Sequence, residues 1–199
     1  MGINFTYEEG QTPIDEDEKF GLKISTVSTS QELNEFEQNN IEKAIQWTLR
    51  NNFKKEVILT EQFVKKLHEK MFGDIWKWSG EFRKSNKNIG VDKTIISIEL
   101  KNLLDDSHYW IENNSYSEDE IAIRTKHRIV SIHLFPNGNG RHSRLFADII
   151  VSHIFNLSVF SWGSNSDLYK PNQNRHLYIK SLKEADNGNY KPLMHFARN

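Results

Sequence analysis

Hydrophobic residues recur at spacings of three and four along most of the chain, which predicts a mainly α-helical protein. The first helix is expected over 29–51, because Thr29 and Glu32 stand at the spacing of a capping box. Its apolar residues, which are expected to face inward, are Leu33, Phe36, Ile41, Ala44, Ile45 and Leu49. Further helices are expected over 60–71, 98–113, 117–133, 139–157, 174–186 and 190–197.

The pattern changes between residues 82 and 98, where short apolar runs favour strands. The runs 89–91 and 94–96 flank the pair 92–93, so two short strands around a turn are predicted. The residues of the first run are Ile89, Gly90 and Val91. Taken alone, this segment favours an ordinary surface hairpin.

Residues 1–28 are polar and carry the acidic run 15–18, which is typical of an extended arm. Two interpretations stay open, a disordered arm and an arm that docks on the domain. The remaining residues, 29–199, have the length of a single domain with room for a hydrophobic core.

Composition narrows the classes of function. The chain has 26 Lys and Arg against 27 Asp and Glu and no basic block, so direct nucleic-acid binding has no electrostatic support. The absence of cysteine excludes disulfides and thiol catalysis and fits a reducing cytosol. No apolar run approaches the roughly 20 residues that span a membrane, and the N-terminus lacks the pattern of a signal peptide. A cytoplasmic protein is therefore expected.

Candidate chemistry is concentrated in the segment 133–144. The Pro, Asn and Gly residues of 136–140 predict a tight loop, and the apolar spacing from Leu145 predicts a helix directly after it. The first N–H groups of such a helix lack intrahelical partners and lie at the positive end of its dipole, so they favour a phosphate. The glycines let this backbone approach an anion closely.

Side chains of the same segment complete a phosphate site. Arg141 and Arg144 are three residues apart, so they share a helix face and can bind neighbouring phosphates. His133 precedes the loop, and its ordinary pKa lets it accept a proton near neutral pH. Asn137 offers an amide oxygen as a weak Mg²⁺ ligand, and Asn139 can fix the loop or a phosphate oxygen. Each feature alone is more often structural, but together they favour a phosphate-binding site.

These residues resemble the signature of the Fic (Fic/Doc) family, His-x-Phe-x-[Asp/Glu]-Gly-Asn-Gly-Arg-x-x-Arg. The matching positions are His133, Phe135, Gly138, Asn139, Gly140, Arg141 and Arg144. The resemblance extends to 67–83 and 185–193 and covers about 40–196, with the mobile mystery protein B subgroup as the nearest. It implies a Fic-type helical bundle with a short β-hairpin flap beside the active-site loop.

The resemblance implies a protein adenylyltransferase, which transfers AMP from ATP, with Mg²⁺, to a Ser, Thr or Tyr hydroxyl of a target protein. On this basis His133 deprotonates the hydroxyl and Arg144 holds the γ-phosphate. The residues that would cradle the phosphates are Gly138, Asn139, Gly140 and Arg141. The flap at 89–91 would hold the target backbone by strand addition. A bacterial toxin or regulatory setting is also implied, with an antitoxin or a DNA-binding protein as partner.

Asn137 departs from the signature, because the family usually has Asp or Glu there as the Mg²⁺ ligand. A neutral amide binds a hard cation more weakly than a carboxylate. Other reactions of the same fold therefore stay open: phosphoryl transfer, another nucleotide donor, or removal of AMP. A third interpretation is a nucleotide-binding interaction module with little turnover, against which the intact His133 argues.

Many Fic proteins carry an inhibitory helix with the pattern [Ser/Thr]-x-x-x-Glu-[Gly/Asn]. Residues 33–38 resemble it loosely, with Glu37 as the candidate glutamate, although Leu33 and Gln38 depart from the pattern. The resemblance implies that Glu37 pairs with Arg144 and blocks the γ-phosphate, since a carboxylate and a phosphate compete for the same guanidinium group. The alternative is a solvated Glu37 on the polar face of the helix.

Overall fold

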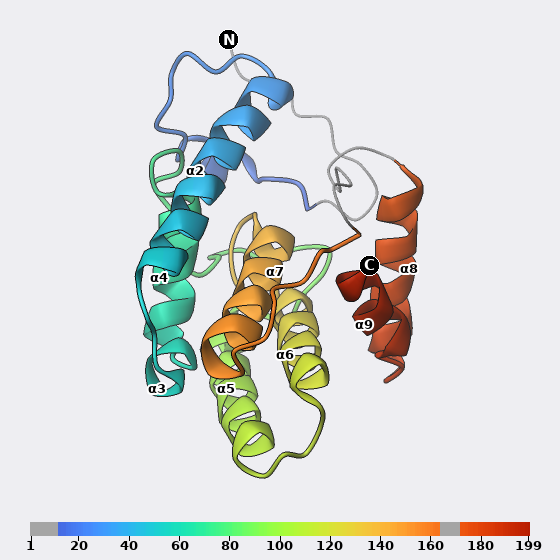
Figure 1. Ribbon diagram of the computed structural model, residues 1–199. Coiled ribbons are helices and arrows are strands. Elements are labelled where there is room, and N and C mark those ends of the chain that lie inside the picture. Colours follow the sequence, from blue (N-terminus) through green and yellow to red (C-terminus); the bar gives the residue numbers. More distant parts are fainter. Residues whose placement is uncertain (1–11, 164–171) are drawn as a thin grey trace.

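The structure is a computed structural model that describes residues 12–163 and 172–199. These residues fold mainly into helices (Figure 1). Their bounds are α1 Glu16–Lys19, α2 Ser30–Arg50, α3 Lys55–Ile58, α4 Glu61–Phe72, η1 Lys93–Ile95, α5 Ile96–Glu112, α6 Glu118–Ile132, α7 Asn139–Ile149, η2 Ile150–Ile154, α8 Gln173–Asp186 and α9 Lys191–Arg198. η1 is a 3₁₀-helix and η2 is a π-helix that continues α7.

All seven helices expected from the sequence are present, and the residues that begin them act as predicted. The Thr29 hydroxyl accepts a hydrogen bond from the Glu32 amide at 3.1 Å, and the Glu32 carboxylate accepts one from the Thr29 amide at 3.1 Å. The Ser117 hydroxyl accepts a hydrogen bond from the Glu120 amide at 3.3 Å and so caps α6. The short helices α1 and α3 were not expected, since a single turn leaves too few residues to establish a periodic pattern.

The helices form a bundle with α6 and α7 at its centre (Figure 1). α5 packs beside α6, α2 packs along α4, and α8 and α9 form a pair on the other side of the bundle. The core is apolar, and its large members that are wholly buried include Phe72, Trp76, Phe135 and Phe146. Within the described residues, no helix combines the length and the apolar character needed to cross a membrane.

The buried face of α2 differs from the expectation. The residues of α2 that are buried are Leu33, Glu37, Asn40, Ala44 and Thr48. Three residues expected inside, Phe36, Ile45 and Leu49, are exposed, Leu49 to 69%. The helix is rotated in this way because Glu37 finds polar partners in the interior, which offsets the cost of its burial.

The expected β-hairpin is not formed, so that prediction is wrong for the described residues. Residues 94–96 lie in η1 and the first turn of α5, because the Asp92 carboxylate accepts a hydrogen bond from the Thr94 amide at 2.9 Å and begins a helix there. Residues 82–92, called the flap segment below, form turns and bends without a strand. The β-bridge that the structure does contain joins Leu22 to Trp76.

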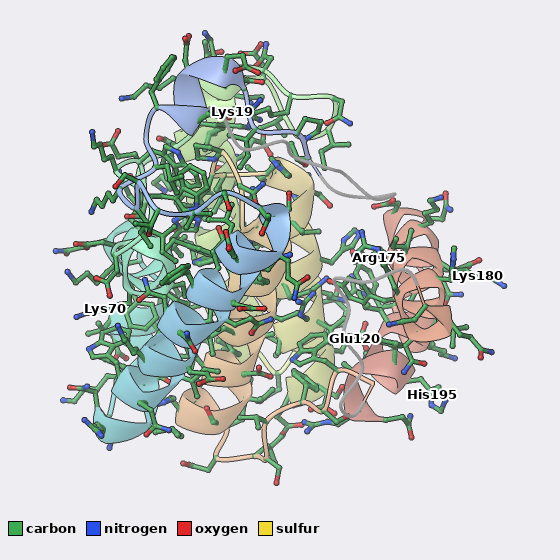
Figure 2. All side chains as sticks on the ribbon, turned by 90° about the horizontal axis from the view of Figure 1, so that it is seen from above. Lys19, Lys70, Glu120, Arg175, Lys180 and His195 are labelled. Atoms are coloured by element: carbon green, nitrogen blue, oxygen red, sulfur yellow. The ribbon has the colours of Figure 1, made fainter. Side chains whose placement is uncertain are left out.

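The described part of the N-terminal arm, residues 12–28, packs on the bundle. The Lys23 amide donates to the Ile75 carbonyl at 2.8 Å, and the Lys77 amide donates to the Gly21 carbonyl at 2.8 Å. Ile14 and Val27 are buried. The docked interpretation therefore holds for 12–28, and residues 1–11 lie outside the described residues. Figure 2 shows Lys19 of α1 well separated from Arg175 and Lys180 of α8.

Candidate active site

The signature loop, residues 133–140, joins α6 to α7 in a strongly constrained conformation. Gly138 begins α7 with a φ of 77°, and a Cβ there would lie 2.6 Å from the Phe72 ring, so only glycine fits. The Asn139 side chain is buried and bridges the loop. Its oxygen accepts from the Phe135 amide at 2.9 Å, and its nitrogen donates to the Phe135 carbonyl at 2.8 Å. The Asn139 amide thus fixes the loop, which leaves its backbone N–H for an anion.

His68 of α4 packs against the signature loop and is hydrogen-bonded to it. Its ring stacks on Phe135 with the centroids 3.7 Å apart. Because Nδ1 accepts from the Gly80 amide at 3.0 Å, we assign the proton to Nε2, which donates to the Asn137 carbonyl at 3.1 Å. Burial, together with the nearby His142, holds the pKa of His68 well below its usual value, so the ring is neutral. Sequence reasoning assigned no role to this histidine.

His133 ends α6 in the left-handed conformation, with a φ of 58°. The residue is 4% exposed, and neither ring nitrogen makes a hydrogen bond of good geometry with a described residue. Burial first, and then the charges of Arg83 and Lys87, lower the pKa of His133 to about 4, against a weaker opposing effect of the Val130 carbonyl. The ring is therefore neutral at pH 7, with a nitrogen lone pair able to accept a proton.

The flap segment lies against His133 although it is not a hairpin. A Cβ at Gly90 would lie 2.7 Å from the His133 Cβ and 3.0 Å from the Ile132 carbonyl oxygen, and Gly90 has a φ of 99°. The Val91 amide donates to the Ile132 carbonyl at 3.3 Å. Two of the three residues predicted to form the target-docking flap, Gly90 and Val91, thus lie at the site, while Ile89 is exposed.

Arg83 joins the flap segment to the end of α6, a role that sequence reasoning missed. Its guanidinium is buried and donates to the carbonyls of His133 at 2.6 Å and Ser85 at 2.8 Å, and also to that of Val91. Its own amide donates to the Leu134 carbonyl at 2.9 Å. The last carbonyls of a helix lack intrahelical donors, and Arg83 satisfies them here. The available sequence signal was the position of this arginine, which lies in the segment that resembles the family's entry into its flap.

Arg141, in the first turn of α7, forms an ion pair with Glu37. Arg141 Nη1 lies 2.6 Å from Glu37 Oε2, and Trp76 Nε1 donates to Glu37 Oε1 at 2.7 Å. The expectation that Glu37 pairs with Arg144 is therefore corrected to the first arginine of the signature. The reason is geometric, since α2 packs on α4, beside the start of α7, and Arg144 lies one turn further along.

Arg144, one turn further along α7, extends toward Tyr178 of α8 and not toward α2, so the two arginines predicted to share a helix face have different partners here. The Arg144 guanidinium is 5.4 Å from the Tyr178 ring centre, and the Tyr178 hydroxyl accepts from the buried Lys126 ammonium at 2.6 Å. Burial alone would raise the pKa of Tyr178, but Lys126 and Arg144 outweigh it and lower the pKa to about 8. Tyr178 is a buried packing residue, and Tyr190, which Arg124 covers, is partly buried against the core.

Asn137 does not present a free oxygen to a cation. Its side-chain oxygen accepts from the Gly138 amide at 2.6 Å, and its nitrogen donates to the Thr12 carbonyl at 3.3 Å. Within the described ranges, no cluster of three or more His, Asp or Glu side chains could hold a metal. These residues do not fit a Mg²⁺ held by protein side chains, and no step below depends on one.

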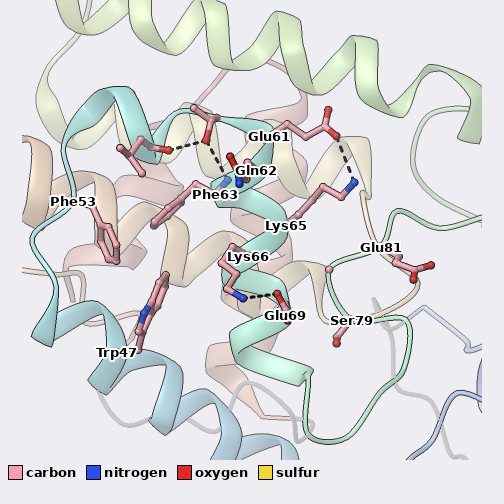
Figure 3. Close-up of a pocket in the computed structure, with 13 residues that line it drawn as sticks. Trp47, Phe53, Glu61, Gln62, Phe63, Lys65, Lys66, Glu69, Ser79 and Glu81 are labelled. Atoms are coloured by element: carbon pink, nitrogen blue, oxygen red, sulfur yellow. Dashed lines mark hydrogen bonds and ion pairs between the residues drawn. The ribbon is translucent and has the colours of Figure 1, made fainter.

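A separate hollow of about 970 Å³ lies on the outer side of α4 (Figure 3). Trp47, Phe53 and Phe63 form its apolar side, and Lys66 and Glu69 pair across its polar side at 2.8 Å. It contains no residue of the signature loop. The chemistry therefore belongs to the loop and not to this hollow.

Comparison with known sequences agrees with this geometry. Residues 58–151 match the model of the Fic/DOC family. The Protein adenylyltransferase Fic of Drosophila mojavensis is 25% identical over 145 residues, which is 71% of this chain and 27% of that protein. The protein of the same name in Drosophila grimshawi is 26% identical over 142 residues, 69% of this chain and 28% of that protein. The chain thus spans little more than a quarter of these relatives.

Solved structures share the fold at lower identity. Fic-1 of C. elegans, residues 134–508, superposes with a TM-score of 0.66 at 20% identity, over 90% of this chain and 51% of that one. BepC of Bartonella tribocorum, solved with bound AMPPNP, gives a TM-score of 0.64 at 17% identity, over 92% of this chain and 97% of that one. The narrower mobile mystery protein B subgroup stays a prediction. The matches to known sequences and structures, with the loop geometry, identify residues 58–151 as a Fic/DOC family domain within a chain of the Fic fold.

Proposed function

We propose that this chain is a protein adenylyltransferase, which transfers AMP from ATP to a Ser, Thr or Tyr hydroxyl of a target protein. The observation that carries the proposal is His133, a buried and neutral imidazole at the start of a glycine-rich loop, whose ring nitrogens make no hydrogen bond of good geometry with a described residue. The name of the curated relatives and the nucleotide analogue bound to BepC support a nucleotide donor.

In this mechanism His133 takes the proton of the target hydroxyl. The hydroxyl oxygen then forms a bond to the α-phosphorus, the bond from that phosphorus to the β-phosphate oxygen breaks, and pyrophosphate leaves. The N–H groups of Asn139 and Gly140 stand at the N-terminus of α7, where a helix favours phosphate, while the Gly138 N–H donates to the Asn137 side chain and shapes the loop. Arg141 and Arg144 supply positive charge for the leaving phosphates.

Glu37 restrains the reaction in this proposal. It holds the Arg141 guanidinium at 2.6 Å, and both side chains are nearly buried. An ATP phosphate that needs Arg141 must displace this carboxylate, since the two anions compete for the same guanidinium N–H groups. Glu37→Gly is expected to raise AMP transfer at least tenfold, whereas Glu35→Gly, at an exposed position of the same helix, should leave it unchanged.

Purified wild type, Glu37→Gly and His133→Ala with ATP labelled at the α-phosphate test the proposal. Label should appear on protein, most strongly in Glu37→Gly, and should be absent in His133→Ala. His195→Ala, which removes an exposed histidine of α9, serves as the matched control and should keep full activity. Full activity in His133→Ala would eliminate the mechanism.

A second candidate function keeps the fold and changes the group transferred, and the neutral Asn137 favours it. Phosphoryl transfer would place label from the γ-phosphate on protein and none from the α-phosphate. Parallel reactions of Glu37→Gly with the two labels therefore separate the candidates.

A further inference from the structure

The arm residues 12–18, called the strap below, lie on the flap segment and on the signature loop. The Thr12 carbonyl accepts a hydrogen bond from the Asn137 side chain at 3.3 Å. At its other end, the Glu18 carbonyl accepts one from the Trp78 indole at 3.0 Å. Thr12 and Ile14 are both 7% exposed, so the strap packs closely against the domain.

Lys87 of the flap segment is the centre of this contact. Its side chain is 3% exposed, and its ammonium lies 2.8 Å from Asp15 Oδ2 and 2.6 Å from Glu18 Oε2. The Ser85 hydroxyl donates to the same Asp15 oxygen at 2.6 Å. A buried ammonium without a partner costs several kcal/mol, so this surface requires carboxylates from whatever covers it.

We propose that Ser85, Lys87 and Asn137 form a docking surface for an acidic segment of the target protein, and that the strap is its built-in occupant. The inference rests on the proposed function for the identity of the partner as a target. Two observations support the docking surface, the position of the flap segment beside His133 and the charge of Lys87. The flap segment that the strap covers is the one that packs on His133 through Gly90, so a segment docked there lies beside the reacting groups.

The spacing of the strap specifies the chemistry of the partner. Asp15 and Glu18 are three residues apart and meet one ammonium, and Ile14 is buried beside them. A target segment that replaces the strap should therefore carry two carboxylates at this spacing and an apolar residue before the first. Because a tethered segment competes at a millimolar effective concentration, the strap also limits access by weaker targets.

Opening of the strap can be measured without any AMP transfer, because the chain has no cysteine. Thr12→Cys introduces a single thiol at a buried position. The hydrogen bond that residue 12 accepts from Asn137 uses its backbone carbonyl and not its side chain. The rate at which an aromatic disulfide reagent labels this thiol reports how often the strap opens. Lys87→Glu should raise the rate at least tenfold, whereas Lys84→Glu, an exposed lysine that pairs with Glu81, should not.

Two controls separate opening of the strap from unfolding. Ser107→Cys places a thiol in the wholly buried part of α5, and it should stay unreactive in Lys87→Glu. Lys87→Asp combined with Asp15→Lys restores an ion pair of reversed sign and should return the Thr12→Cys labelling rate toward that of the parent.

Docking of an acidic segment is tested in trans on the full chain. Asp15→Lys with Glu18→Lys should open the strap by charge repulsion from Lys87 and free the surface. A fluorescent peptide with the sequence of residues 12–19 should then bind, by anisotropy, and a peptide with Asn and Gln at the two acidic positions should not. Adding Lys87→Glu should abolish the binding.

An unchanged labelling rate in Lys87→Glu, or no peptide binding to the opened chain, would overturn the inference and leave the proposed function untouched. Labelling and binding as expected, together with no AMP transfer in Glu37→Gly, would instead overturn the proposed function and keep the docking surface.

Discussion

At the scale of single residues, the site depends on side chains that hold the backbone in place. Asn139 bridges the loop, His68 supports it through Asn137, and Arg83 donates to four carbonyls around its entrance. A planar guanidinium can direct several N–H groups at once, which a lysine ammonium on a flexible stem cannot do in the same geometry. The position of the neutral His133 ring therefore depends on side chains that have no part in the proposed chemistry.

Arg83→Lys should lower AMP transfer about tenfold or more in the Glu37→Gly background, mainly through kcat. The reason is that the carbonyls of His133, Ser85 and Val91 lose their shared donor and the end of α6 loosens. Steady-state kinetics measure it, and Arg128→Lys, which alters an ion pair with Glu99 on the surface of α6, is the control. Equal kcat values for Arg83→Lys and Arg128→Lys would contradict the positioning role.

At the scale of elements, α2 carries Glu37, the proposed restraint on the site. Its capping box fixes where the helix begins, and the buried Glu37 fixes which face turns inward. Helical spacing predicted the bounds of this helix well. The inward face could not be predicted, because the partners of Glu37 are Trp76 and Arg141, distant in sequence, and a periodicity of apolar residues contains no information about them.

Thr29→Ala should lower the free energy of unfolding by about 1 kcal/mol and raise AMP transfer, because α2 then holds Glu37 on Arg141 less firmly. Thr60→Ala removes the equivalent cap of α4, where the hydroxyl accepts from the Phe63 amide at 3.1 Å. It should cost similar stability without raising transfer. Denaturant unfolding and the labelled-ATP assay measure both effects, and a rise in both variants would show that general loosening is the cause.

The sequence predicted those parts of the site whose residues lie close together along the chain. His133, the glycines and Arg141 are neighbours in the loop and the first turn of α7, so local reasoning was enough to bring them together, whereas Arg144 extends toward Tyr178. The predicted β-hairpin was wrong because the Asp92 carboxylate begins a helix where the short apolar run 94–96 favoured a strand. Arg83 and Lys87 were missed because their partners lie about 50 and 70 residues away, a separation that no local pattern reveals.

At the scale of the whole molecule, buried titratable groups link stability to pH. Burial lowers the pKa of both His133 and His142 to about 4, and it raises the pKa of Asp148 to about 7. As the pH falls from about 6.5 to 4, the unfolded chain binds protons at these two histidines before the folded chain does. Their burial therefore lowers the free energy of unfolding over this range. Asp148 has the opposite sign, since its stabilisation is complete below about pH 4 and is lost as pH rises toward 7.

His133→Asn should therefore flatten the pH dependence of the free energy of unfolding. His133 accounts for about 3 kcal/mol of the free energy of unfolding that is lost between pH 6.5 and 4, because a shift of one pKa unit corresponds to about 1.4 kcal/mol. Denaturant unfolding at several pH values measures the difference from wild type. Asp148→Asn should steepen the decline on acidification, and identical profiles for wild type and both variants would contradict the assignment.

In the proposed reaction His133 takes the proton of a target hydroxyl so that AMP can be transferred to it. The transfer of α-phosphate label to protein by Glu37→Gly, compared with Glu37→Gly combined with His133→Ala, tests this role. We expect strong labelling by the first and a loss of at least a hundredfold in the second, with ATP binding retained. Equal labelling by the two would contradict it.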